Sequence, residues 1–167
     1  MITISTARTR EDFDAAEALC KGFGEWDVVA AEPFGLTREQ LIPAFHSDTS
    51  ESLAAGFGTE EARILIARFD GAPAGMLSFN LFDETTAELQ KFFVDPKFRG
   101  KQIGRELIGT ALAGFRKDGR QRVLVHTAIY MTNAIALYES SGFTRCPRFR
   151  PTPGMVKHTD VFLSQTL

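Results

Sequence analysis

Residues 87–107 read AELQKFFVDPKFRGKQIGREL, and this stretch decides the fold. A mostly apolar strand, predicted over 87–94, ends at Asp95-Pro96 because proline cannot donate to a strand ladder. A cationic loop with two glycines follows and runs directly into an amphipathic helix predicted over 104–117. Helix N-termini present unpaired N–H groups and partial positive charge, and small residues let the backbone approach an anion. The stretch therefore predicts an anion site at a strand-to-helix junction.

The residues predicted to hold this anion form one continuous run, and its backbone amides and three cations predict a pyrophosphate cradle. They are Arg99, Gly100, Lys101, Gln102, Ile103, Gly104 and Arg105. The common phosphate loops, GxxxxGK[ST] and GxGxxG after a strand, are both missing from the chain. The alternative interpretation of the run is a solvated basic turn.

Apolar spacing and turn residues predict the elements around this stretch. The expected strands are 2–7, 63–69, 73–82, 87–94, 122–126, 144–149 and 158–164; the expected helices are 10–24, 37–45, 47–55, 104–117 and 131–141. Gly22 and Gly24 are expected to close the first long helix, and Asp70-Gly71 to form a hairpin turn. Three consecutive strands followed by strand–helix alternation predict one α/β domain over 1–167 with a mixed sheet.

Composition and charge restrict the class of protein. A net charge of −2 over 167 residues argues against a nucleic-acid partner. Cys20 and Cys146 form no CxxC pair, which favours a reducing compartment. No apolar run approaches a membrane span and the first residues do not resemble a signal peptide, so we expect a cytoplasmic protein without a membrane or metal partner.

A second motif, NAIALYESSGF at 133–143, follows the predicted loop at the expected distance. Together the two segments resemble the GNAT superfamily of N-acetyltransferases. Its first motif, Val-x-Pro and then Arg/Gln-x-x-Gly-x-Gly/Ala, corresponds to Val94-Asp95-Pro96 and 99–104. Its second, Asn-x-x-Ala-x-x-Leu-Tyr-x-x-x-Gly-Phe, corresponds to 133–143 with a closer Asn–Ala spacing. Gln102 departs from the family because it replaces the middle glycine, and it would be strained if that position needs positive φ.

The resemblance implies a fold, a cofactor and an activity. The fold is a mostly antiparallel twisted sheet of about seven strands with helices on both faces. The cofactor is acetyl-CoA, whose pantetheine arm pairs with the strand edge at Phe92, Phe93 and Val94 and contacts Asn133. The expected reaction is direct acetylation of a small-molecule primary amine in a ternary complex. The alternatives are acetylation of a protein lysine or N-terminus, and a non-catalytic acyl-CoA sensor.

The resemblance also implies catalytic residues. Glu88, eleven residues before Arg99, is the expected general base, and Tyr138 the expected general acid for the departing thiolate. A main-chain N–H near Phe93 or Val94 would stabilise the oxyanion, and broken alternation at 91–94 predicts a β-bulge there.

Each of these roles has a competing interpretation. His126 is the other candidate base, and Glu88 is otherwise a solvent-facing carboxylate or the partner of a Lys or Arg. Tyr138 is otherwise an apolar helix-face residue, Asn133 a helix N-cap, and the two phenylalanines are core residues.

The acceptor pocket is the least defined part of the prediction. It is expected between the early helices and the closing strands. Candidate residues for a cationic amine are Glu25, Trp26, Asp27 and Glu32; candidates for a carboxylate are Arg148, Arg150, Lys157 and His158. Nothing in the sequence indicates an oligomeric state, so a homodimer is expected only as the commonest assembly.

Overall fold

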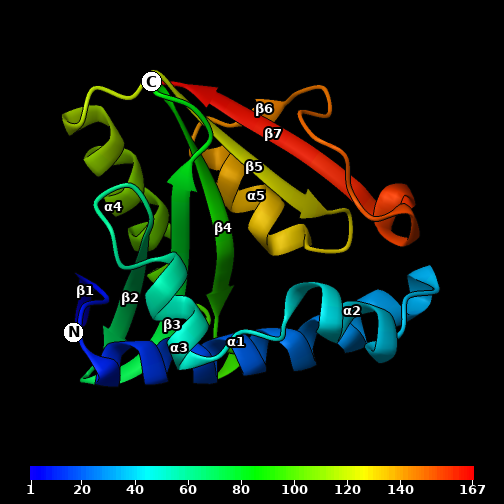
Figure 1. Ribbon diagram of the computed structural model, residues 1–167, viewed down its shortest axis with the longest axis horizontal. Helices are drawn as coiled ribbons and strands as arrows, with labels where there is room; N and C mark the ends of the chain where they lie inside the picture. The colour runs from blue at the N-terminus through cyan, green and yellow to red at the C-terminus, as the bar shows by residue number, and fades with distance from the viewer.

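One seven-stranded sheet organises the protein, which a computed structural model describes over residues 1–167 (Figure 1). Its strands are β1 (Ile2–Thr6), β2 (Arg63–Phe69), β3 (Ala72–Leu81), β4 (Thr86–Val94), β5 (Arg122–Ala128), β6 (Thr144–Arg145) and β7 (Asp160–Thr166). Their order is β1-β2-β3-β4-β5-β7-β6, and only the β4–β5 pair is parallel. The expected mixed, mostly antiparallel sheet is confirmed.

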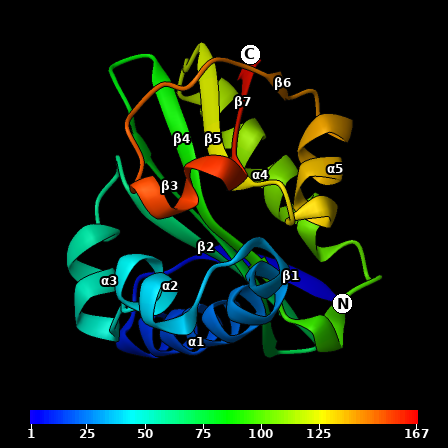
Figure 2. The same ribbon diagram turned by 90° about the vertical axis from the view of Figure 1, so that its right-hand side faces the viewer.

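Helices cover both faces of the sheet, as expected (Figure 2). They are α1 (Arg10–Ala31), α2 (Arg38–Phe45), α3 (Ser50–Gly56), α4 (Ile103–Lys117) and α5 (Thr132–Ser140), with 3-10 turns η1 (Glu32–Phe34), η2 (Pro96–Phe98) and η3 (Gly154–Thr159). Helices α1 and α3 lie on one face, and α4 and α5 on the other. Each face has its own apolar cluster, the larger one between the sheet and α4.

The first long helix does not end at Gly22 or Gly24, and that prediction is wrong. Helix α1 continues to Ala31, and Gly24 is buried inside it. A Cβ at position 24 would lie 3.0 Å from the His46 Cβ and 3.0 Å from the Ile42 Cδ1. The glycine therefore allows α2 to approach α1, and tertiary packing outweighs the low helix propensity of glycine.

The closing part of the chain also differs from the prediction. Strand β6 contains only Thr144 and Arg145, and the rest of the predicted strand 144–149 belongs to a long connection to β7. This connection crosses the same side of the sheet as α2 and α3 (Figure 2). Strand β5 continues to Ala128, two residues beyond the predicted end. The remaining elements lie close to their predicted ranges, and Asp70-Gly71 forms the expected turn with φ of 49° and 86°.

Strand β4 has two irregularities that shape the site. Met76 pairs with Phe93 and Ser78 with Gln90, so one residue of β3 opposes Lys91 and Phe92. Lys91 has a φ of 47°, and the predicted β-bulge is confirmed. The parallel ladder to β5 ends at the pair Leu89–Val125. Beyond this pair β4 and β5 diverge (Figure 1), which opens the sheet in its middle.

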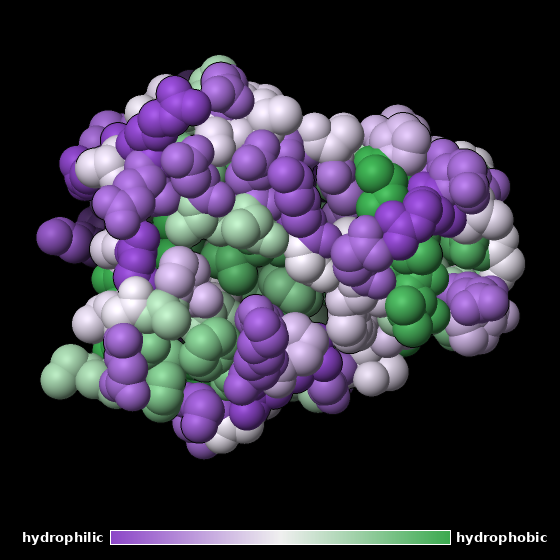
Figure 3. Space-filling view, turned by 90° about the horizontal axis from the view of Figure 1, so that it is seen from below, coloured by the Kyte–Doolittle hydropathy of each residue, from purple (hydrophilic) through white to green (hydrophobic).

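The face seen from below is mostly hydrophilic, with apolar areas left of its centre and toward its right-hand end (Figure 3). The largest exposed apolar side chains are few and scattered along the chain. None of the helices has the length and apolar character needed to cross a membrane.

Candidate active site

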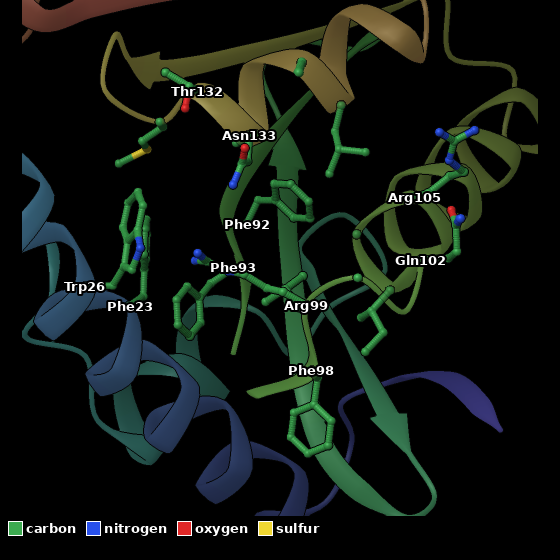
Figure 4. A pocket seen from close by; sticks show the side chains of 18 residues that line it. Phe23, Trp26, Phe92, Phe93, Phe98, Arg99, Gln102, Arg105, Thr132 and Asn133 are labelled. Atoms are coloured by element: carbon green, nitrogen blue, oxygen red, sulfur yellow. The ribbon is translucent and has the colours of Figure 1, made fainter. Parts of the chain in front are cut away.

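A cleft of about 410 Å³ lies where β4 and β5 separate, and we call it the loop cleft. Its walls come from α1, the end of β4, the start of α4 and α5 (Figure 4). The lining residues are Phe23, Trp26, Phe92, Phe93, Val94, Phe98, Arg99, Gly100, Gln102, Ile103, Gly104, Arg105, Met131, Thr132, Asn133, Ala134, Ala136 and Leu137. The structure thus brings together most of the residues predicted to bind the cofactor.

The loop before α4 forms one end of this cleft. Glu106 is the first residue of α4 whose N–H is bonded, to the Gln102 carbonyl at 3.0 Å. The N–H groups of Ile103, Gly104 and Arg105 precede it and have no backbone acceptor. A helix N-terminus with free donors at a cleft is suited to binding an anion. Because this property comes from the backbone, it needs no particular side chain.

Gln102 has a positive φ, the conformation in which a glutamine is strained. Its φ is 68°, in the left-handed region, and Gly100 has a φ of 80°. A non-glycine residue there costs about 1–2 kcal/mol. The loop therefore keeps its conformation with glutamine at the cost of local strain.

The three cations of the loop lie in different surroundings. Arg99 and Arg105 line the loop cleft, and the Arg99 guanidinium lies 5.4 Å from the Trp26 ring centroid. The Lys101 ammonium lies 4.8 Å from the centroid of Phe69, and Lys101 does not line the cleft. Of the predicted loop residues, Lys101 is the one whose side chain stands apart.

Gly104 of α4 and Asn133 of α5 contribute to the cleft in different ways. A Cβ on Gly104 would lie 2.9 Å from Leu137 Cδ1 and 3.1 Å from Phe92 Cζ, so this position has no room for a side chain. Asn133 lies in the first turn of α5 and lines the cleft, while Met131 occupies the N-cap position. Asn133 is therefore not a helix N-cap, and its side chain is directed toward the cleft (Figure 4).

The end of β4 offers main-chain groups to the gap between β4 and β5. The Asp95 N–H donates to the Ala74 carbonyl on the β3 side at 2.8 Å. Because N–H groups alternate in direction along an antiparallel strand, the Phe93 N–H points to β3 and the Val94 N–H points into the gap. Val94 thus carries a free donor at a place that no strand of the protein fills.

A second cleft of about 370 Å³ adjoins the first, and we call it the charged cleft. The two clefts share Phe23, Phe92, Met131 and Ala134. Glu88 of β4 lines the charged cleft and is only 1% exposed. Both of its carboxylate oxygens accept hydrogen bonds from Arg150, at 2.8 Å for Nη1 to Oε2. Glu88 is thus a buried carboxylate paired with an arginine from the connection to β7.

His126 lies in the same cleft, and Asp160 orients it. The His126 Nε2 lies 2.7 Å from Asp160 Oδ1, and the imidazole stacks on Phe162. Burial acts to raise the pKa of Asp160, but hydrogen bonds from Thr152, His126 and Arg148 outweigh it and lower the pKa. An ionised Asp160 holds the proton on Nε2, which leaves Nδ1 as the basic nitrogen.

Tyr138 of α5 is 3% exposed and lines the charged cleft. Its ring packs against Phe92 and Phe143. Burial raises the pKa of the phenol, because the ionised form would lie among apolar groups. The side chain is therefore a neutral hydroxyl over the physiological pH range.

A buried polar group from α1 and α2 completes the charged cleft. Asp27 accepts from the Tyr130 hydroxyl at 2.7 Å, and its other oxygen lies 2.7 Å from His46 Nε2. Sequence reasoning missed His46, Tyr130 and Asp160, which are single polar residues without a motif. Only the tertiary structure brings them together.

The candidates for the acceptor pocket divide clearly. Asp27 and Arg150 line the charged cleft, and Trp26 lines the loop cleft. Arg148 binds Asp160 from outside the lining. The others lie elsewhere: Glu25 pairs with Arg38, His158 bonds the Phe34 carbonyl, and Glu32 and Lys157 line neither cleft. The arrangement offers hydrogen-bond donors for an anion in the loop cleft and acid–base side chains in the charged cleft.

Comparison with known proteins agrees with this geometry. Residues 30–143 match the acetyltransferase (GNAT) family. An IAA acetyltransferase of Azospirillum brasilense is 34% identical over 92 residues, which are 54% of this chain and 60% of that protein. A mycothiol acetyltransferase of Geodermatophilus obscurus is 39% identical over 62 residues, which are 37% of this chain and 20% of that protein. The chain thus spans less than two thirds of the length of these curated relatives.

Solved structures share the fold over the whole chain. The PaiA N-acetyltransferase from Thermoplasma acidophilum, crystallised in complex with coenzyme A, superposes with a TM-score of 0.78. The alignment covers 100% of this chain and 99% of that one at 16% identity. At this identity the likeness concerns the fold.

Proposed function

Since the chain belongs to the acetyltransferase (GNAT) family, we propose that it transfers an acetyl group from acetyl-CoA to the primary amine of a small molecule. The observation that carries the proposal is the meeting of two clefts. A helix N-terminus with free N–H groups ends the loop cleft, and buried acid–base side chains line the cleft beside it.

The loop cleft is the proposed cofactor site. Acetyl-CoA, the acyl donor of this family, supplies an activated thioester when bound. The N–H groups of 103–105 and the Arg99 and Arg105 side chains would hold its pyrophosphate. Gly104 leaves room for a close approach of the backbone. Main-chain groups of 92–94 and the Asn133 amide would hold its pantetheine arm in the gap between β4 and β5.

Glu88 is the proposed general base. An amine attacks only as the neutral species, and a side chain with a pKa near 10.4 is almost fully protonated at pH 7. Both oxygens of Glu88 bind Arg150, so Arg150 has to withdraw before Glu88 can take a proton. His126, held by Asp160, is the alternative base in the same cleft.

Tyr138 is the proposed general acid. Its phenol stays protonated because burial raises its pKa, and it lies beside Phe92 where the two clefts meet. It would give its proton to the departing thiolate, whose pKa is near 8.5. The Val94 N–H, directed into the gap, is the proposed donor to the oxyanion.

The shape of the charged cleft favours a small acceptor. Residues 150–153 of the connection to β7 line it on one side and α2 on the other. The cleft has a volume of about 370 Å³, which suits a small molecule.

Calorimetry and a thiol-release assay test the proposal. The purified protein is titrated with coenzyme A, and thiol release from acetyl-CoA is then followed with a panel of small amines. We expect coenzyme A to bind and at least one amine to accelerate thiol release. Binding without turnover of any amine would identify a sensor, and absence of binding would refute the cofactor site.

A further inference from the structure

All charged residues that line the charged cleft already have a partner within the protein. Lys91 pairs with Asp48 at 2.5 Å, His126 with Asp160 at 2.7 Å, and Asp27 with His46 at 2.7 Å. The remaining pair is Glu88–Arg150. A charged acceptor therefore finds no free counter-charge in the cleft and has to exchange with an existing pair.

Only the Glu88–Arg150 pair is built for such an exchange. Asp160 is held by three side chains and Asp27 by two, and their side chains are only 3% and 4% exposed. The Lys91–Asp48 pair has only its lysine in the cleft. In the last pair both members line the cleft, and the Arg150 side chain is 36% exposed whereas that of Glu88 is 2% exposed. Arg150 can move, and Glu88 has to keep a cation beside it.

From this geometry, and on the basis of the proposed function, we infer that the acceptor is a short zwitterion, an α- or β-amino acid. Its ammonium replaces Arg150 on Glu88, and its carboxylate binds the guanidinium that has been displaced. The two charges of the acceptor have to lie close together because Arg150 and Glu88 are in direct contact. A simple amine would satisfy Glu88 but would leave Arg150 without an anion.

The exchange also explains how a paired carboxylate becomes a base. While Arg150 binds both oxygens, each oxygen already accepts a charged hydrogen bond that competes with the amine. Once the acceptor carboxylate holds Arg150, Glu88 faces the ammonium alone and accepts its proton. The neutral amine attacks the thioester carbonyl, the C–S bond breaks, and the thiolate takes the Tyr138 proton. The amide nitrogen loses its second proton, which restores the Tyr138 phenol, and Glu88 passes the first proton to water, so the net reaction releases one proton.

Matched acceptors test this inference on the protein of residues 1–167. Each of a panel of amino acids is compared with its carboxamide and with the decarboxylated amine, and kcat/KM is measured by thiol release. We expect the preferred amino acid to exceed its amide and its amine by at least about tenfold, mainly through KM. Equal rates for the acid and the amide would overturn the inference and leave the proposed function intact. Coenzyme A binding with no acetylation of any acceptor would refute both.

Arg150→Gln tests the residue itself. We expect it to remove the preference for the acid over the amide, whereas Arg145→Gln, at an exposed position paired with Glu139, should retain it. Since Arg150→Gln leaves a buried carboxylate without a partner, Arg150→Lys serves as a second variant that keeps the charge and loses the bidentate geometry. It should reduce the preference without abolishing it. An unchanged preference in both Arg150 variants would overturn the inference.

Discussion

The loop cleft and the charged cleft adjoin each other but are built in opposite ways. The loop cleft combines backbone donors, at a helix N-terminus and a strand edge, with the Arg99, Arg105 and Asn133 side chains, and most of its other lining residues are apolar. The charged cleft obtains its polar groups from side chains that are already paired. A backbone site tolerates changes of sequence, whereas a site of paired side chains depends on each partner. The first suits a constant ligand and the second an acceptor that varies.

The largest effect should come from the charged cleft. Asp160→Asn should destabilise the protein by about 2–3 kcal/mol at pH 7, because it removes the ionised partner of His126 and Arg148. The pKa of Asp160 is lowered in the folded protein, so its contribution is present above pH about 4 and is lost as the pH falls through the folded pKa.

Urea unfolding at several pH values measures this difference. The gap between the wild type and Asp160→Asn should be widest near pH 7 and should narrow toward pH 3. Asp118→Asn, at an exposed position after α4, should change stability by less than about 0.5 kcal/mol. A gap that widens in acid would contradict the assigned ionisation.

Tyr138→Phe probes the junction of the two clefts. We expect kcat to fall about 100-fold while the KM of acetyl-CoA stays within about twofold, because the phenol acts only on the leaving group. The raised pKa means that the wild type should show no loss of activity from Tyr138 up to about pH 10. Steady-state rates over this pH range check both points. A variant with full kcat would make Tyr138 a core residue only.

Arg105→Glu tests the loop cleft. It places a negative charge beside the proposed pyrophosphate and should raise the KM of acetyl-CoA at least about tenfold with little change in kcat. Lys101→Glu is the matched control, since its side chain lies over Phe69 outside the cleft. It should raise this KM by less than about threefold. Equal effects would mean that general charge in the loop matters and cleft geometry does not.

The smallest expected effect belongs to Gln102→Gly. The left-handed φ of 68° costs glutamine about 1–2 kcal/mol, and glycine loses about 0.5–1 kcal/mol through unfolded-state entropy. The variant should therefore be more stable by about 0.5–1 kcal/mol in urea unfolding. Gln121→Gly, at an exposed position without positive φ, should be less stable instead. If Gln102→Gly also destabilised the protein, the glutamine side chain would have a role beyond the turn.

The sequence predicted the loop cleft better than the charged cleft because the residues of the loop cleft lie close together in the chain. The loop cleft comes mainly from two continuous segments, 92–105 and 131–137, whose glycines and apolar spacing are visible in the chain. The resemblance to the GNAT superfamily added their roles. The orientation of Lys101 away from the cleft was not predictable, because spacing alone does not fix the direction of a long side chain.

The charged cleft needs segments from five parts of the chain, and its pairings have large sequence separations. Glu88 and Arg150 are 62 residues apart, and Asp27 and Tyr130 are 103 residues apart. The continuation of α1 past Gly24 was missed because the reason for that glycine lies on α2. The strand predicted over 144–149 is too long because the end of β6 depends on how the connection to β7 packs, which the sequence does not show.

The separation of β4 and β5 leaves the sheet with an interior edge that the chain itself does not close. If the pantetheine arm lies there as proposed, the fold gains its missing strand partner only when the ligand is bound. Folding and ligand concentration are then linked by mass action, so that a hundredfold excess over Kd adds about 2.7 kcal/mol to the free energy of unfolding. In a cell, the stability of the protein would therefore rise and fall with the concentration of coenzyme A and its thioesters.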